Sequence, residues 1–320
     1  MSNIASYYGI NSRKLQRHYK HQVSGFKEWN QISHAEDYLI YPENMSEYLS
    51  IDEVSLSKGE LYTIITNKNP KTKNKKSIVA IINGTEAKII QEVVEKISIE
   101  KRKLVKEITL DMARNMGAAS QHCFVNAKQV IDRFHVVRLV MDAMQHVRVK
   151  QRWKAIEEEN LAIKEAKTKG IKYQPQILSN GDTTKELLAR SKYLLYKFDH
   201  QWTATQRKRA QVLFEKYPNL KQIYQLILQF RNIYKHTIKA NAERDFMGWK
   251  IQALALNVDE LNTSIHSLEY HMEHILNFFD NRNTNANAES FNAKIKNFRT
   301  NLRGVTDTKF FLFRLEKLFA

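Results

Sequence analysis

The sequence predicts a mixed α/β protein in which a β-sheet core carries a large all-helical segment. Short β-branched, apolar runs gather in the first 135 of the 320 residues, and β-strands favour such runs. After Phe134 the pattern becomes helical and stays so to about Asp280. Glycine (9) and proline (4) are scarce while hydrophobic residues make up 42%, so the chain can bury a sizeable core rather than remain disordered.

The order of the expected strands points to one sheet topology. Strands are expected at 49–54, 61–66, 77–82, 105–110 and 130–132, with a helix capped by Thr85 between the third and the fourth. Three antiparallel strands, followed by a helical crossover to a strand parallel with the first, form a ribonuclease-H-like sheet. We therefore expect a ribonuclease-H-like mixed sheet with a large all-helical insertion before its last core helix, plus a short helical N-terminal segment.

This topology divides the chain into four expected parts. Residues 1–45 form a basic helical segment and 46–138 the first part of the catalytic core. Residues 139–281 form the helical insertion, and 282–320 the final core helices, which carry Glu289.

The first 27 residues are basic and allow two interpretations. Ala5, Gly9 and Leu15 have the small, glycine, apolar spacing of a helix-turn-helix, and Ser12 would cap its second helix. Such a helix would present Arg13, Arg17 and Lys20 to DNA. In the other interpretation the segment is a basic amphipathic helix that packs on the main domain.

The charge balance indicates a polyanionic partner. Lys and Arg number 51 against 34 Asp and Glu, which gives a net charge of +17 and a pI near 9.7, and nucleic acid is the usual partner of so basic a chain. The single cysteine, Cys123, excludes a disulfide framework and any zinc module built from cysteines. No apolar run approaches the roughly 18 residues of a membrane span. We expect a cytoplasmic, nucleoid-associated protein.

Three carboxylates fall at positions that the topology brings together. Asp52 lies inside an apolar strand, Asp111 follows the fourth strand, and Glu289 opens the last helix. An isolated aspartate is more often a helix cap or a surface residue. Aspartates on neighbouring strands repel each other, however, and a divalent cation between them is the usual remedy. Such a triad could hold two ions and hydrolyse a phosphodiester.

Four runs carry a more specific pattern: SIDE at 50–53, LDM at 110–112, VIDRFHVV at 130–137 and TNANAESFNAKIK at 284–296. Together they resemble the DDE transposases of the ISL-three type, in particular the ISAon group of bacterial insertion sequences. The resemblance implies that Asp52, Asp111 and Glu289 are catalytic and bind two Mg²⁺ or Mn²⁺ ions. It also implies an enzyme that cleaves DNA at terminal inverted repeats and transfers the strands into target DNA.

The resemblance also defines the expected partners. They are double-stranded DNA, as transposon ends and target, and further copies of the chain in a homo-oligomer assembled on DNA. Relatives commonly begin with a Cys-rich zinc-binding region, which this chain lacks. Either a separately encoded recognition protein supplies that region or the basic N-terminal segment replaces it. Two alternative functions stay open: a metal-dependent nuclease or resolvase without strand transfer, and a noncatalytic DNA-binding protein with a decayed core.

Further residues are expected to support the site or to contact DNA. The loop at 68–76 holds five lysines and no acid, which fits either a phosphate-contacting loop or a solvated turn. The last helix has two expected sides. The side facing substrate carries Glu289, Asn292, Lys296 and Arg299, and the side facing the core carries Phe291, Ile295, Phe298 and Leu302. The expected supporting residues are Asp132, His135, Asn285 and Asn292, and the expected DNA-binding residues are Arg13, Arg17, Lys20, Lys73, Lys75, Lys294, Lys296, Arg299 and Arg303.

Overall fold

The structure is a computed structural model that describes residues 2–57, 59–68, 77–282, 286–302 and 305–320. Contacts divide the chain into two compact units. The first combines residues 1–132 with 283–320, and the second consists of residues 133–282. No helix in the described part of the chain is long and apolar enough to cross a membrane.

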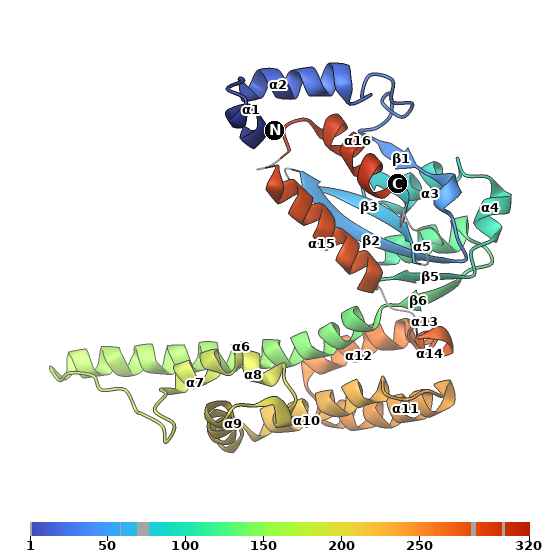
Figure 1. The fold of residues 1–320 in the computed structure, drawn as a ribbon. Coiled ribbons are helices and arrows are strands. Elements are labelled where there is room, and N and C mark those ends of the chain that lie inside the picture. The colour runs from blue at the N-terminus through green and yellow to red at the C-terminus, as the bar shows by residue number, and fades with distance from the viewer. Residues whose placement is uncertain (1, 58, 69–76, 283–285, 303–304) are drawn as a thin grey trace. The chain divides into compact units, whose positions relative to one another are not determined.

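A six-stranded mixed sheet forms the centre of the first unit (Figure 1), with the strand order β1-β4-β3-β2-β5-β6. Strands β2, β3 and β4 form an antiparallel meander, β1 adds an antiparallel edge beside β4, and β5 and β6 continue in parallel on the other side of β2. The strands are β1 (Tyr38–Ile40), β2 (Tyr48–Ser57), β3 (Glu60–Asn67), β4 (Ile78–Asn83), β5 (Glu107–Leu110) and β6 (Lys128–Ile131).

The five strands expected from the sequence correspond to β2 through β6, and the crossover from the meander to β5 is parallel as predicted. This mixed α/β arrangement is compatible with a ribonuclease-H-like core. Strand β1 was missed because a run of three residues is too short to show a period. The predicted cap at Thr85 is wrong: Glu86 is the N-cap residue of α3, and its side chain makes no capping hydrogen bond.

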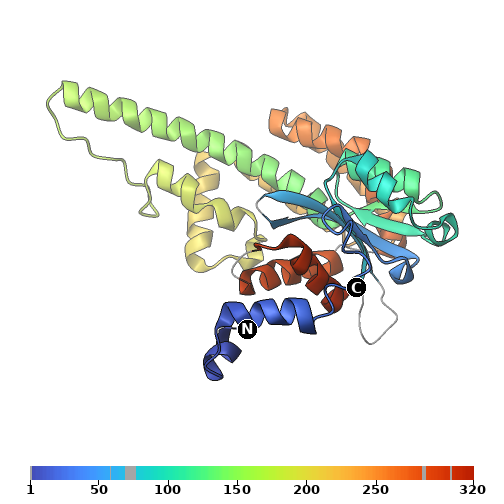
Figure 2. The same cartoon turned by 90° about the horizontal axis from the view of Figure 1, so that it is seen from above.

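Helices cover both faces of the sheet (Figure 2), with α15 and α16 on one face and α3 and α5 on the other. Val54, Tyr62 and Ile64 of the first face pack in one buried cluster with Phe291 and Ile295 of α15, as the spacing along that helix predicts. The helices of this unit are α1 (Ser2–Tyr7), α2 (Ser12–His18), α3 (Ala87–Val94), α4 (Ile99–Lys103), α5 (Arg114–Cys123), α15 (Ala286–Asn301) and α16 (Thr308–Phe319).

The N-terminal segment forms two short helices joined by a tight turn. Gly9 has a φ of 62°, a left-handed conformation that glycine adopts without strain. The Asn11 side chain accepts the backbone N–H of Lys14 at 3.0 Å. Asn11 is therefore the cap of α2, and the expectation that Ser12 caps it is wrong, since Ser12 is the first residue of the helix.

The second unit is entirely helical in its regular structure. Helix α6 (Arg133–Thr168) packs against α7, α10 and α12, and Phe230, Phe246 and Trp249 form part of the buried core. Pro218 starts α10 and so separates it from α9. The other helices are α7 (Thr184–Arg190), α8 (Lys192–Leu195), α9 (Ala204–Lys216), α10 (Pro218–Ile233), α11 (Lys239–Ala255), α12 (Asp259–Tyr270), α13 (Met272–Leu276) and α14 (Phe278–Asn281).

A carboxylate of α16 ties the segment before β2 to the C-terminal helix. Glu316 Oε2 accepts the indole N–H of Trp29 at 2.6 Å and the hydroxyl of Tyr41 at 2.8 Å. Burial and the Glu316 charge raise the pKa of Tyr41, so its hydroxyl remains a donor at neutral pH. Because Trp29 and Tyr41 are both buried, neither donor can turn to water if the carboxylate is removed.

We expect Glu316→Ala to lower the free energy of unfolding by about 2–4 kcal/mol, because two buried donors lose their acceptor. Urea unfolding followed by Trp fluorescence measures this change. Glu92→Ala is the control, since Glu92 forms an exposed ion pair with Lys88 on α3, and exposed pairs contribute little to stability. Equal effects of the two substitutions would show that the Glu316 bonds contribute nothing.

Candidate active site

Asp52 lies within β2, and both of its carboxylate oxygens are held. The backbone N–H of Glu53 donates to Oδ1 at 2.9 Å, and Nδ2 of Asn292 donates to Oδ2 at 2.6 Å. Residues 52 and 292 are far apart in the sequence, so the second bond connects the central strand directly to α15. The Asp52 carboxylate is half-buried, which leaves it partly open to a ligand.

Asp111 follows β5 directly and is brought next to Asp52 by the strand pairing. Ser50 of β2 pairs with Thr109 of β5 in parallel, and Asp52 and Asp111 lie two residues beyond that pair on their own strands. Asp111 Oδ1 accepts the backbone N–H of Ala113 at 2.8 Å, which orients the carboxylate in the turn before α5. The predicted proximity of the two aspartates therefore follows from the register of the sheet.

The pKa of a third carboxyl group, that of Glu53, is affected by these two aspartates. Burial, and after it the charges of Asp111 and Asp52, raise the pKa of Glu53. Like charges raise a carboxyl pKa only when they lie close together. Negative charge therefore accumulates where β2 and β5 run side by side.

Helix α15 carries the expected third catalytic residue. Asn292, which donates to Asp52, is buried at 7% exposure, and Nη1 of Arg299 donates to the carbonyl oxygen of Ser55 at 3.4 Å. These two bonds fix the side of α15 that faces β2. Position 289 lies three residues before Asn292 in this helix, on the same side; its side chain is outside the described residues. Asn285 is also outside them.

Asp132 directly follows β6, the strand that pairs with β5. Its backbone N–H donates to the Leu110 carbonyl at 2.9 Å, and its side chain is buried at 2% exposure. Helix α6 starts at the following residue. His135, in the first turn of that helix, is half-buried and lies edge-on to the Phe134 ring.

A lysine is buried on the same face of the sheet as Asp52. Lys68 Nζ donates to the Thr109 hydroxyl and lies 3.9 Å from Glu107 Oε1. Burial lowers the pKa of Lys68 to about 8, and the charges of Glu107 and Asp132 oppose that shift. Lys68 was expected in the basic loop. It instead follows β3 directly, and the two-residue repeat of a strand places it on the same face of the sheet as Ile64 and Thr66.

Comparison with known proteins decides the family. Residues 49–315 match the family model of the DDE transposases of the ISL3 type, described as a transposase. The chain belongs to this transposase family. Its general function is DNA transposition, and its substrate is DNA. No curated protein and no solved structure matches the chain.

In this transposase the predicted DNA-binding residues fall into three groups. Arg13, Arg17, Lys294 and Lys296 are exposed on α2 and α15. Lys20 and Arg299 are engaged within the protein, because Lys20 bonds to Asp307 and lies over the rings of Phe26 and Phe310. Lys73, Lys75 and Arg303 lie outside the described residues.

The described side chains of the transposase do not form a complete metal site. Among the side chains that the structure describes, no group of three or more His, Cys, Asp and Glu is arranged to hold a metal ion. Glu289 falls outside that set, so the expected triad is represented only by Asp52 and Asp111. Carboxylate oxygens are the donors that Mg²⁺ and Mn²⁺ prefer, and the chemistry of these two groups therefore fits such an ion.

We expect Lys68→Met to change how stability depends on pH. The folded-state pKa of Lys68 is about 8, below the ordinary value near 10.4. Between these pH values the unfolded chain binds more protons, so the contribution of Lys68 to the free energy of unfolding rises with pH. The rise should be on the order of 2–4 kcal/mol and should be absent from Lys68→Met.

Urea unfolding of both proteins at pH 7.5 and at pH 10.5 measures this difference. Lys88→Met, at an exposed lysine of α3, controls for the loss of any lysine. Parallel pH profiles for wild type and Lys68→Met would contradict the assignment.

Proposed function

We propose that this protein is a metal-dependent DDE transposase that cleaves DNA at terminal inverted repeats and joins the freed 3′-hydroxyls to target DNA. The observation that carries the proposal is the Asn292 to Asp52 hydrogen bond. It holds the helix of Glu289 against the strand of Asp52, whose register in turn brings Asp111 alongside. Membership of the ISAon group is part of the proposal.

Two divalent ions, Mg²⁺ or Mn²⁺, fit the residues available for them. Asp52, Asp111 and Glu289 are the proposed ligands, and the raised pKa of Glu53 is evidence that the first two concentrate negative charge. When bound, such ions would activate the attacking hydroxyl and stabilise the leaving oxygen of the phosphodiester. The protein's own contribution is to hold its carboxylates before the ions arrive.

The chain's residues have distinct parts in this proposal. Asn292 and the Glu53 backbone fix the two oxygens of Asp52, and the Ala113 N–H fixes Asp111. Asp132 and His135 support the site. Exposed Lys294 and Lys296 on α15 bind the phosphates of the strand that approaches it.

The charge of +17 supports double-stranded DNA as the partner, and we propose a homo-oligomer assembled on that DNA. Exposed Arg13 and Arg17 on α2 make the N-terminal segment the candidate for end recognition, in place of a separately encoded protein. The transposase match favours this function over a nuclease without strand transfer and over a noncatalytic DNA-binding protein.

We expect Asp52→Asn, Asp111→Asn and Glu289→Gln each to abolish cleavage in Mg²⁺ or Mn²⁺. Each removes a proposed metal ligand but also removes a negative charge near phosphates, so DNA binding should be retained or strengthened. Gel assays of strand nicking and transfer, with anisotropy for binding, measure both properties. Asp37→Asn, an exposed carboxylate before β1, is the control. Full cleavage by any one of the three variants would remove that residue from the site.

We expect the double variant Arg13→Gln, Arg17→Gln to lower the slope of log K against log salt for DNA binding by about 2, roughly one for each lost phosphate contact. Substitution is a sharper test than deletion of residues 1–30, because Phe26 and Trp29 belong to the buried core. Lys309→Gln controls for the loss of a cation. An unchanged slope would show that α2 does not touch DNA.

A further inference from the structure

A cavity in the helical unit is lined by cations and aromatic rings that the proposed catalytic site does not use. Its volume is about 330 Å³, at the lower end of the range for small-ligand sites. It lies between the first turn of α6, the segment after α8 and the end of α10, and none of its lining residues is acidic. They are Arg133, Phe134, Val137, Phe198, Arg231, Tyr234 and Lys235.

Two of the three cations that line this cavity lie over an aromatic ring. The guanidinium of Arg231 lies 3.8 Å from the centroid of the Phe198 ring, and Lys235 Nζ lies 5.8 Å from it. Arg231 Nη1 also donates to the Tyr196 carbonyl at 3.1 Å, which fixes the plane of the guanidinium. In the described part of the chain no carboxylate forms an ion pair with Arg133, Arg231 or Lys235.

An exposed aromatic ring adds a stacking surface. Phe134 is 54% exposed, although a phenylalanine in the first turn of a long helix could pack inward. Rings and planar guanidinium groups both stack on nucleobases, while unpaired cations attract phosphates. A ligand that satisfies both features is a nucleotide whose base is not engaged in a duplex.

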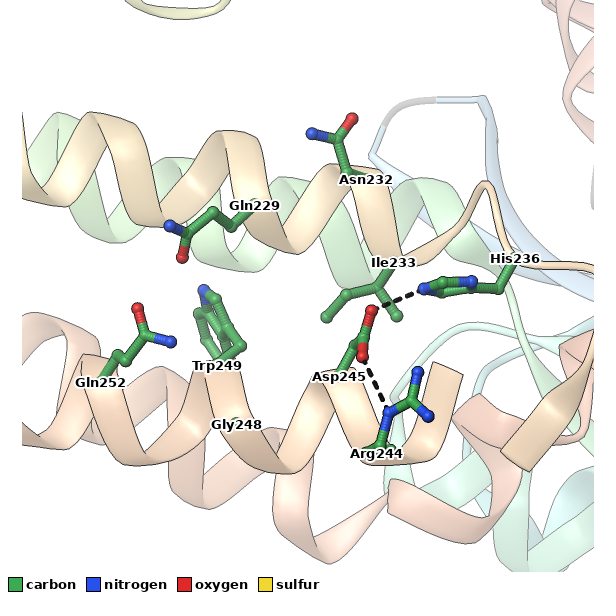
Figure 3. Close-up of a pocket in the computed structure, with 9 residues that line it drawn as sticks. All are labelled: Gln229, Asn232, Ile233, His236, Arg244, Asp245, Gly248, Trp249 and Gln252. Atoms are coloured by element: carbon green, nitrogen blue, oxygen red, sulfur yellow. Dashed lines mark hydrogen bonds and ion pairs between the residues drawn. The ribbon is translucent and has the colours of Figure 1, made fainter. Parts of the chain in front are cut away.

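A second cavity in the same unit is a weaker candidate for a phosphate-binding site because of its charged residues. The groove between α10 and α11 is larger, about 630 Å³. Its charged groups neutralise each other (Figure 3), because His236 Nε2 lies 2.7 Å from Asp245 Oδ2 and Arg244 Nε lies 3.4 Å from Oδ1. A carboxylate therefore lines that groove and pairs with its cations, whereas no acid lines the cavity at Arg133.

We propose that the cavity at Arg133 binds one unpaired nucleotide of the DNA substrate. Its base stacks on Phe134 and on the plane of Arg231, and its phosphate binds Arg133 and Lys235. This assignment rests on the proposed function only in taking DNA as the substrate. It gives the Arg133-Phe134 pair of the 130–137 run a role that the carboxylate site does not provide.

The test compares two DNAs in EDTA, where metal-dependent cleavage cannot occur. One is a fully paired duplex, and the other is the same duplex with a single bulged 2-aminopurine. The full chain should bind the bulged DNA about tenfold more tightly, within the range for stacking one base on protein rings, and should change the 2-aminopurine fluorescence. Phe134→Ala should remove the preference and leave paired-duplex affinity unchanged. Lys235→Gln should weaken binding of the bulged DNA and reduce its salt dependence.

Matched controls exist on α6, where Trp153 is 60% exposed and is followed by exposed Lys154. Trp153→Ala and Lys154→Gln should keep the preference. Equal affinity of wild type for the two DNAs, or a preference that survives Phe134→Ala, would overturn the nucleotide site while leaving the proposed function intact. Displacement of the bulged DNA by poly-glutamate as readily as by single-stranded DNA would show a protein-docking surface instead. Absence of binding to either DNA would contradict the proposed function itself.

Discussion

The proximity of acidic side chains in the middle of β2 and just after β5 is the constraint on which the arrangement of these strands and α15 depends. Two aspartates on neighbouring strands repel each other, and after burial their charges contribute to the raised pKa of Glu53. The fold must offset this repulsion. Part of the offset is local, because backbone N–H groups hold Asp52 and Asp111. Part is distant, because Asn292 donates to Asp52 and makes the position of α15 depend on that carboxylate.

Lys68, which contacts Thr109 and Glu107 of β5, is a second buried charge that the sheet must accommodate. A buried ammonium is unfavourable by itself, and burial lowers its pKa to about 8. Its neighbours Glu107 and Asp132 are themselves buried acids, and the charge of each opposes the effect of burial on Lys68. Lys68 therefore offsets part of the negative charge that Glu107 and Asp132 bring into this face of the sheet.

The sequence was a good guide where local patterns decide the structure. The strands β2 to β6 follow from β-branched runs, and the parallel pairing of β5 beside β2 follows from the crossover helix. Patterns could not predict β1, which is too short, or the burial of Lys68, whose partners Glu107 and Thr109 come from another strand. Caps were also misassigned, since both Asn11 and Ser12 can cap a helix and only the backbone at α2 distinguishes them.

The 130–137 run crosses from one unit of the chain to the other. Asp132 ends the first stretch of the first unit and Arg133 begins the second unit, so the run spans one of the two junctions between the units. On one side of that junction Asp132 is buried, and its charge acts to raise the pKa of Lys68. On the other side Arg133 and Phe134 line a cationic cavity. Adjacent residues of this run therefore have different surroundings. A substitution of Asp132 would change the charge balance around Lys68, whereas a substitution of Arg133 or Phe134 would change the lining of the cavity.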